Sequence, residues 1–156
     1  ISSFTKYKNN LKTITRIIDS TAREEILHGK FGATLVNIIR KENPQWFDEE
    51  MEESIRFRVR KAFRAEMKVL DWIFENGQLD FLPRECVDEF LKLRLNDSLA
   101  LMNYEPEYEL NEELLSKSEY LTVKLESSMD IDFFDQRSAD YSTGRDCSIE
   151  AVFKIN

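Results

Sequence analysis

The sequence has few of the residues that interrupt helices or cross-link chains: three prolines, four glycines and two cysteines among 156 residues. Because proline and glycine disfavour regular structure, their scarcity leaves room for long uninterrupted helices. Cys86 and Cys147 lie far apart and form neither a metal-ligand motif nor a redox motif. This excludes a disulfide scaffold and a zinc finger, and we interpret both residues as reduced thiols in a cytoplasmic protein.

Long apolar runs and excess positive charge are also absent. No apolar stretch approaches the roughly 20 residues that span a bilayer, and no signal peptide is visible. The formal net charge is −8, so the chain would repel a phosphate backbone, which argues against nucleic-acid binding. What remains, 42% hydrophobic and 33% charged residues, is typical of one globular domain.

Three amphipathic stretches predict long helices: one from about Lys8 to Lys41, one from an N-cap at Asp48 to Glu75, and one from Pro83 to about Met102. After Tyr104 the periodicity weakens, and from Ser127 to Asn156 no sustained amphipathic pattern remains. We therefore expect an all-α bundle, with a helical part over residues 1–126 and a flexible C-terminal tail over residues 127–156.

A glutamate and the only histidine interrupt the apolar stripe of the first predicted helix. Apolar residues recur every three or four positions at Ile14, Ile18, Leu35 and Ile39, and the same stripe passes through Thr21, Glu25, His28 and Gly32. The pattern therefore predicts that Glu25 and His28 face inward, where an unpaired charge is costly.

Glu-x-x-His places a carboxylate and an imidazole on adjacent turns of one helical face. In ferritin-like di-metal proteins such pairs project into a helical bundle and bind iron or manganese. The alternatives are a surface ion pair and a buried structural pair, which share this spacing. Because His28 is the only histidine, this chain contributes at most part of such a site.

Several motifs resemble the small (β) subunit of class I ribonucleotide reductase. REEILHGKFG at residues 23–32 is similar to its metal-binding helix, and DFFDQRSADY at 132–141 to a segment near its C-terminus. AEMKVLDWIFENG, RLNDSLALMNYEP and the final CSIEAVF resemble, in order, two following helices and the family's tail. The resemblance implies a ferritin-like helical bundle of which this chain forms one part.

The resemblance implies roles for four residues. Glu25 and His28 match two of the family's metal ligands, and Tyr141 matches the tail tyrosine that relays a radical between subunits. Glu24 occupies the position of an aspartate on the electron path, so its longer side chain departs from the family. On composition alone, Tyr141 reads as an ordinary exposed aromatic residue in a tail.

The implied function is oxygen activation at a di-iron or manganese/iron centre shared with residues upstream of this chain. The oxidising equivalent would pass to a large subunit, which reduces ribonucleotides to deoxyribonucleotides. The implied partners are an N-terminal half of the small subunit, supplied by a split gene or a cleaved chain, the large subunit, and a second assembled small subunit. The alternatives are a non-catalytic helical subunit without metal and another ferritin-like di-iron oxidase.

Overall fold

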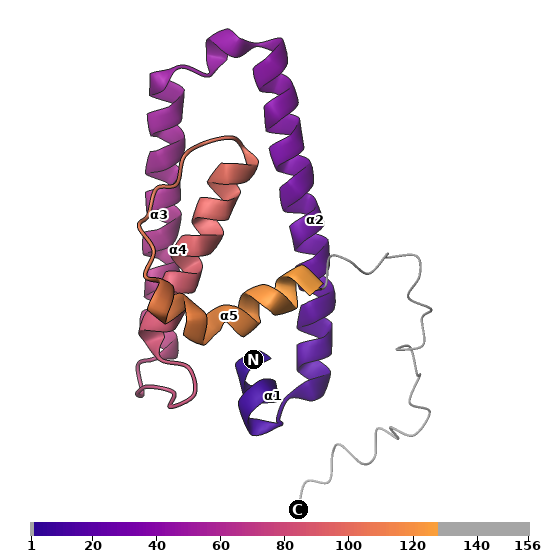
Figure 1. Ribbon diagram of the computed structural model, residues 1–156, viewed down its shortest axis with the longest axis vertical. Helices are drawn as coiled ribbons and strands as arrows, with labels where there is room; N and C mark the ends of the chain where they lie inside the picture. The colour runs from indigo at the N-terminus through magenta and orange to yellow at the C-terminus, as the bar shows by residue number, and fades with distance from the viewer. Residues whose placement is uncertain (1, 128–156) are drawn as a thin grey trace, which may run out of the picture.

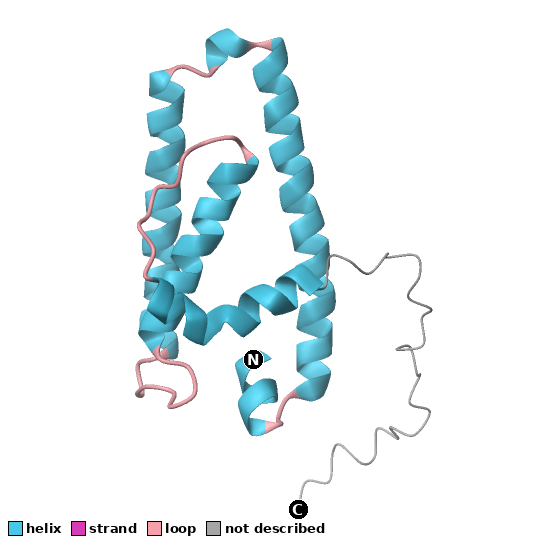
Figure 2. Cartoon of the chain, in the orientation of Figure 1, coloured by secondary structure: helices cyan, strands magenta, loops and turns pink. Residues whose placement is uncertain are grey.

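A computed structural model describes residues 2–127, and every regular element in that range is a helix, as Figure 2 shows. Within these residues the only β-type pairing is an isolated bridge between Leu79 and Leu82. The elements are α1 (Ser2–Lys8), α2 (Lys12–Glu42), the 3-10 helix η1 (Pro44–Trp46), α3 (Glu49–Ile73), α4 (Arg84–Leu101) and α5 (Glu112–Ser127). The all-α prediction is confirmed, and no helix in the described range is long and apolar enough to cross a membrane.

Local sequence signals explain the boundaries of α3 and α4. The side chain of Asp48 accepts a hydrogen bond from the Met51 amide at 2.9 Å, so the predicted N-cap of α3 is confirmed. The chain leaves α3 through Gly77, whose φ of 121° is readily available only to glycine. Pro83 precedes α4, where the missing N–H of proline costs no helical hydrogen bond.

The first predicted helix is observed as α2, which begins four residues later than predicted, and a short additional helix, α1, precedes it. Leu11 adopts a left-handed conformation with φ of 62°, which separates α1 from α2. The Thr5 hydroxyl donates to the Asn10 carbonyl at 2.7 Å and hydrogen-bonds the Thr15 hydroxyl at 2.6 Å. These bonds hold α1 against the start of α2.

A further helix, α5, follows Tyr104, in addition to the three long helices that the periodicity predicts. Its first turn contains Glu112 and Glu113, and the Asn111 side chain accepts a hydrogen bond from the Leu114 amide at 3.2 Å. Helix α5 packs most extensively on α4, where Cys86 of α4 is fully buried, as is Ser118 of α5. Tertiary packing therefore supports a helix whose own apolar periodicity is weak.

Helices α2 and α3 form the two long sides of the molecule and are joined at one end by η1 (Figure 1). They make almost no direct contact, because α4 lies beside α3 and α5 crosses from the α3–α4 pair to α2. Among the described residues, the buried apolar core is correspondingly small and consists of Ala33, Leu70, Phe74, Cys86 and Leu99.

Polar side chains attach the connection between α4 and α5. Asn96 is 8% exposed; its amide donates to the Tyr108 carbonyl at 2.8 Å and accepts from the Glu107 and Tyr108 amides at 3.0 and 3.1 Å. The Glu107 carboxylate binds Arg60 at 2.8 Å and Arg56 at 3.1 Å. The Arg60 hydrogen bond is the main reason that the pKa of Glu107 lies below its usual value.

Candidate metal-binding helix

Glu25 and His28 lie near the middle of α2, on adjacent turns of the same face. Nδ1 of His28 is 3.9 Å from Oε2 of Glu25, and their side chains are 72% and 71% exposed. At this exposure the pair contributes little to stability by itself, since water screens its attraction. The expectation that both residues are buried within this chain was wrong.

The packed face of α2 explains their exposure. Thr15 and Ala33 are buried, and Ala22, Ile26 and Asn37 are half-buried on the same side of the helix. Small and polar residues dominate this side because α4 and α5 approach the α2 backbone closely there. Hydrophobic periodicity does not reveal such a surface, and the apolar stripe that contains Glu25 and His28 lies on another side of α2.

The remaining sides of α2 form an exposed apolar surface, which we call the open face. Its large side chains are between 37% and 69% exposed: Ile14, Ile17, Ile18, Leu27, Phe31, Leu35 and Ile38. Glu25 and His28 lie within this surface, and a Cβ added at nearby Gly32 would meet nothing within 4 Å. An exposed group of this many large apolar side chains on one helix is typical of a surface that another helix covers.

A cavity of about 580 Å³ continues the open face at the η1 end of the molecule. It is lined by apolar side chains of α2, η1, α3 and α4, among them Ile39, Met51, Ile55 and Leu95. Among the described residues that line it, Arg58 alone is charged. The described part of the chain therefore leaves apolar space between its two long helices.

Within the described residues, the set of possible metal ligands is incomplete for a di-metal centre. Among residues 2–127 no group of three or more His, Cys, Asp or Glu side chains lies close enough together to hold a metal ion. Glu24 is exposed beside Glu25 on α2. Tyr141 and the tail motifs lie outside the described residues. Two ligands on adjacent turns of one helix fit one contribution to such a centre and not the whole of it.

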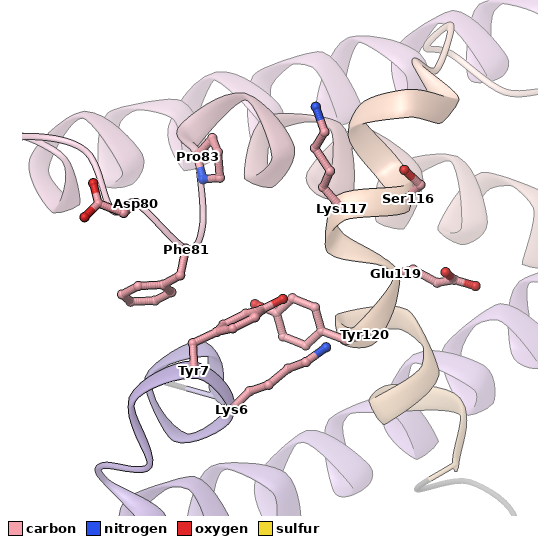
Figure 3. A pocket seen from close by; sticks show the side chains of 9 residues that line it. All are labelled: Lys6, Tyr7, Asp80, Phe81, Pro83, Ser116, Lys117, Glu119 and Tyr120. Atoms are coloured by element: carbon pink, nitrogen blue, oxygen red, sulfur yellow. The ribbon is translucent and has the colours of Figure 1, made fainter.

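A second cavity, of about 770 Å³, lies between α1, the α3–α4 connection and α5, and Figure 3 shows the residues that line it. The Lys6 ammonium lies 3.9 Å from the centre of the Tyr120 ring and 5.2 Å from that of Tyr7. The Tyr7 and Phe81 ring centres are 5.7 Å apart. Lys6 therefore covers the faces of these aromatic rings, and this cation–π contact attaches α1 to α5.

Tyr120 also helps to attach α1 to α5. Its hydroxyl donates to the Ser3 hydroxyl at 2.5 Å, and burial raises the pKa of the phenol. Neither a carboxylate nor an imidazole within the described residues accepts the phenol proton, so this tyrosine lacks a general base. Sequence reasoning missed the cluster because its residues come from three distant segments with no shared spacing.

Comparison with known proteins shows the same family that the sequence motifs resemble. The family model described as "Ribonucleotide reductase, small chain" matches residues 1–114. The protein named "Ribonucleoside-diphosphate reductase subunit beta" from Chlamydia pneumoniae is 25% identical over 126 residues, which make up 81% of this chain and 35% of that protein. The chain thus spans about a third of the length of that relative. This chain belongs to the ribonucleotide reductase small-chain family.

Proposed function

We propose that this chain is the part of a ribonucleotide reductase small subunit that supplies Glu25 and His28 to a di-metal centre. The observation that carries the proposal is the position of this pair in the middle of the open face of α2. Burying a carboxylate and an imidazole under an apolar surface costs solvation free energy, and binding to a shared cation offsets that cost.

The donors suit iron or manganese. Carboxylate oxygens and imidazole nitrogens favour these ions, and the spacing on adjacent turns lets both side chains reach toward one centre. The remaining ligands come from helices outside the described residues, since one such pair cannot complete a di-metal centre. When bound, the centre supplies the oxidising equivalent for ribonucleotide reduction.

Helices of the missing part of the subunit cover the open face in this proposal. Covering the exposed half of one large apolar side chain contributes roughly 1 kcal/mol, so the seven on α2 contribute on the order of 7 kcal/mol. This is comparable to the whole stability of a small domain. Assembly with these helices thus stabilises the chain and encloses Glu25 and His28 together.

Two further residues act outside the metal centre in this proposal. Glu24 lies next to the ligand Glu25 and accepts or releases a proton as charge moves through the subunit. Tyr141 carries a one-electron oxidation to the large subunit, which binds the ribonucleotide. The tail over residues 127–156 docks on that subunit as a short segment. Its affinity for the large subunit is modest, because the segment loses conformational entropy when it becomes ordered on binding.

Metal content of the assembled small subunit tests the proposal. The complete small subunit is prepared with and without Glu25→Ala and His28→Ala, and iron and manganese are measured by mass spectrometry after separation by size. We expect each single variant to lose at least one metal ion per subunit and the double variant to bind almost none.

Glu42→Ala is the matched control, because it removes an exposed carboxylate from the end of the same helix. Its metal content should equal that of the unmodified subunit. Full occupancy of both metal positions in the double variant would refute the assignment of Glu25 and His28. An assembled, folded subunit that binds no metal even without substitution would instead support the non-catalytic alternative.

A further inference from the structure

Three aromatic rings line the cavity between α1, the α3–α4 connection and α5, and we call them the aromatic box: Tyr7, Phe81 and Tyr120. The ring of Tyr7 has its centre 5.5 Å from that of Tyr120 and 5.7 Å from that of Phe81, so the rings adjoin one another (Figure 3). The Lys6 ammonium lies 3.9 Å from the centre of the Tyr120 ring. The Lys8 ammonium lies 5.3 Å from the centre of the Phe81 ring. The aromatic box therefore attracts organic cations, and those it holds are lysines of the chain itself.

Lys6 is held only weakly on the aromatic box. Its side chain is exposed, and a cation–π contact at an exposed site contributes little because water competes for the ammonium group. A lysine side chain also has many rotamers, so fixing it over the rings costs conformational entropy. Competition from Lys6 therefore lowers the apparent affinity for a free organic cation by only about three- to sixfold.

Two carboxylates line the same cavity, each next in sequence to a ring of the aromatic box. Asp80 precedes Phe81 and Glu119 precedes Tyr120, and both acidic residues are exposed. Within the described part of the chain no ion pair engages either of them. Lys117, which also lines the cavity, lies 3.3 Å from a different glutamate of α5. The cavity can therefore bind a second positive charge in addition to the one on the rings.

We propose that this cavity binds a linear organic diamine. One ammonium group of the ligand replaces that of Lys6 on the aromatic box, and the other pairs with Asp80 or Glu119. The cavity volume of about 770 Å³ is within the range of small-molecule sites. Its lining residues come from α1, the α3–α4 connection and α5, so this site is separate from Glu25 and His28 on α2 and independent of the proposed metal centre.

Charge complementarity favours a diamine over other small ligands. The chain has a net charge of −8, which raises the local concentration of polyvalent cations. The ring faces and the two unpaired carboxylates repel an anion, and a neutral ligand gains nothing from either. A monoamine gains the ring contact alone, so it binds more weakly than a diamine. We expect a dissociation constant for the diamine on the order of 0.1–1 mM at low salt.

Isothermal titration calorimetry of the full chain with 1,4-diaminobutane tests the proposal. Lys6→Met removes the internal competitor and keeps an apolar side chain of comparable length, so the affinity should rise by about three- to sixfold. Lys12→Met is the matched control, because it makes the same charge change at an exposed position outside the cavity. It should change the affinity by less than about twofold. If Lys6 serves only to attach α1 to α5, Lys6→Met should instead lose helix content in circular dichroism and gain no affinity.

Further variants separate the contribution of the rings from that of the carboxylates. Tyr7→Leu should weaken the binding of both 1,4-diaminobutane and 1-aminobutane by about fivefold, because both ligands use the aromatic box. Phe57→Leu, which removes an exposed ring from α3, should leave both affinities unchanged. The double variant Asp80→Asn, Glu119→Gln should weaken the diamine by about fivefold and the monoamine much less, since only the diamine carries a second charge.

Three results overturn the proposal. The first is equal affinity of the unmodified chain and Tyr7→Leu for the diamine, which would mean diffuse attraction to a chain of net charge −8. The second is equal binding of 1,4-butanediol, the neutral analogue of the diamine. The third is the absence of binding to Lys6→Met at about 10 mM diamine with unchanged helix content. If Lys6→Met loses helix content, the comparison between the unmodified chain and Tyr7→Leu decides.

Discussion

Replacing Asn96 by leucine removes three hydrogen bonds that hold the connection between α4 and α5. The change keeps the size of the side chain nearly constant, so its main effect is on the backbone groups of Glu107 and Tyr108. Each of these hydrogen bonds contributes about 0.5–1.5 kcal/mol, and more where the remaining group stays buried. We therefore expect Asn96→Leu to lower the free energy of unfolding by roughly 2–4 kcal/mol.

Urea denaturation of the full chain, followed by circular dichroism, measures this loss. Ser98→Ala on the same helix is the control, because the Ser98 hydroxyl is exposed and bonds only to the Arg94 carbonyl of its own helix. It should change stability by no more than about 0.5 kcal/mol. Asn96→Asp keeps the acceptor but turns a carboxylate toward the Tyr108 carbonyl, so it should also destabilise the chain.

The reasoning fails if Asn96→Leu costs less than about 1 kcal/mol while its helix content is unchanged. That result would mean that water or a rearranged connection satisfies the same backbone groups. Amide exchange of residues 104–111 separates the two cases, because a rearranged connection should retain protection and a hydrated one should lose it.

Three other predictions concern charge, backbone conformation and the tail. The pKa of Glu107 is lowered in the folded chain. Its ionised carboxylate therefore stabilises the fold above the unfolded pKa of about 4.3, and this stabilisation is lost as the pH falls through the folded pKa. In urea titrations, the difference in unfolding free energy between the wild type and Glu107→Gln should shrink below about pH 4. Gly77→Ala should lower the free energy of unfolding by about 1–2 kcal/mol, because Gly77 has a φ of 121° that alanine adopts only with strain. Gly29→Ala should raise it by about 0.5–1 kcal/mol in the same assay, because alanine favours a helix over glycine and the added Cβ meets nothing within 4 Å. Tyr141→Phe should leave metal content unchanged and nearly abolish ribonucleotide reduction in the complete enzyme; turnover within a few-fold of wild type would refute the relay.

The sequence predicts helices well where one residue type decides the local geometry. Asp48 as an N-cap and Pro83 before α4 have a direct chemical effect on the backbone, so these boundaries agree with the structure. The later start of α2 was missed because leucine has no preference for the positive φ that Leu11 adopts just before the helix. The start of α5 had a usable signal in Asn111, Glu112 and Glu113, which weak apolar periodicity obscured.

The candidate site illustrates a different limit. Spacing alone identified Glu25 and His28 as a pair, and their common face follows from helix geometry. Their burial could not be inferred, because it depends on which side of α2 the other helices cover. Those helices pack against Thr15 and Ala33, where small side chains permit close approach, and a hydrophobicity pattern gives such residues little weight.

The hydrogen bonds of the α4–α5 connection also bear on the order in which the chain folds. Those that join it to α4 link residues 11, 12 and 22 apart, whereas the bonds from Asn37 and Arg40 of α2 to the end of α4 link residues 64 and 62 apart. Because long loops close at a greater entropic cost, we expect α4 and α5 to associate first and α2 to join them late. A helix that joins late keeps its open face accessible while α4 and α5 associate, and pulse-labelled amide exchange should show α4 protected before α2.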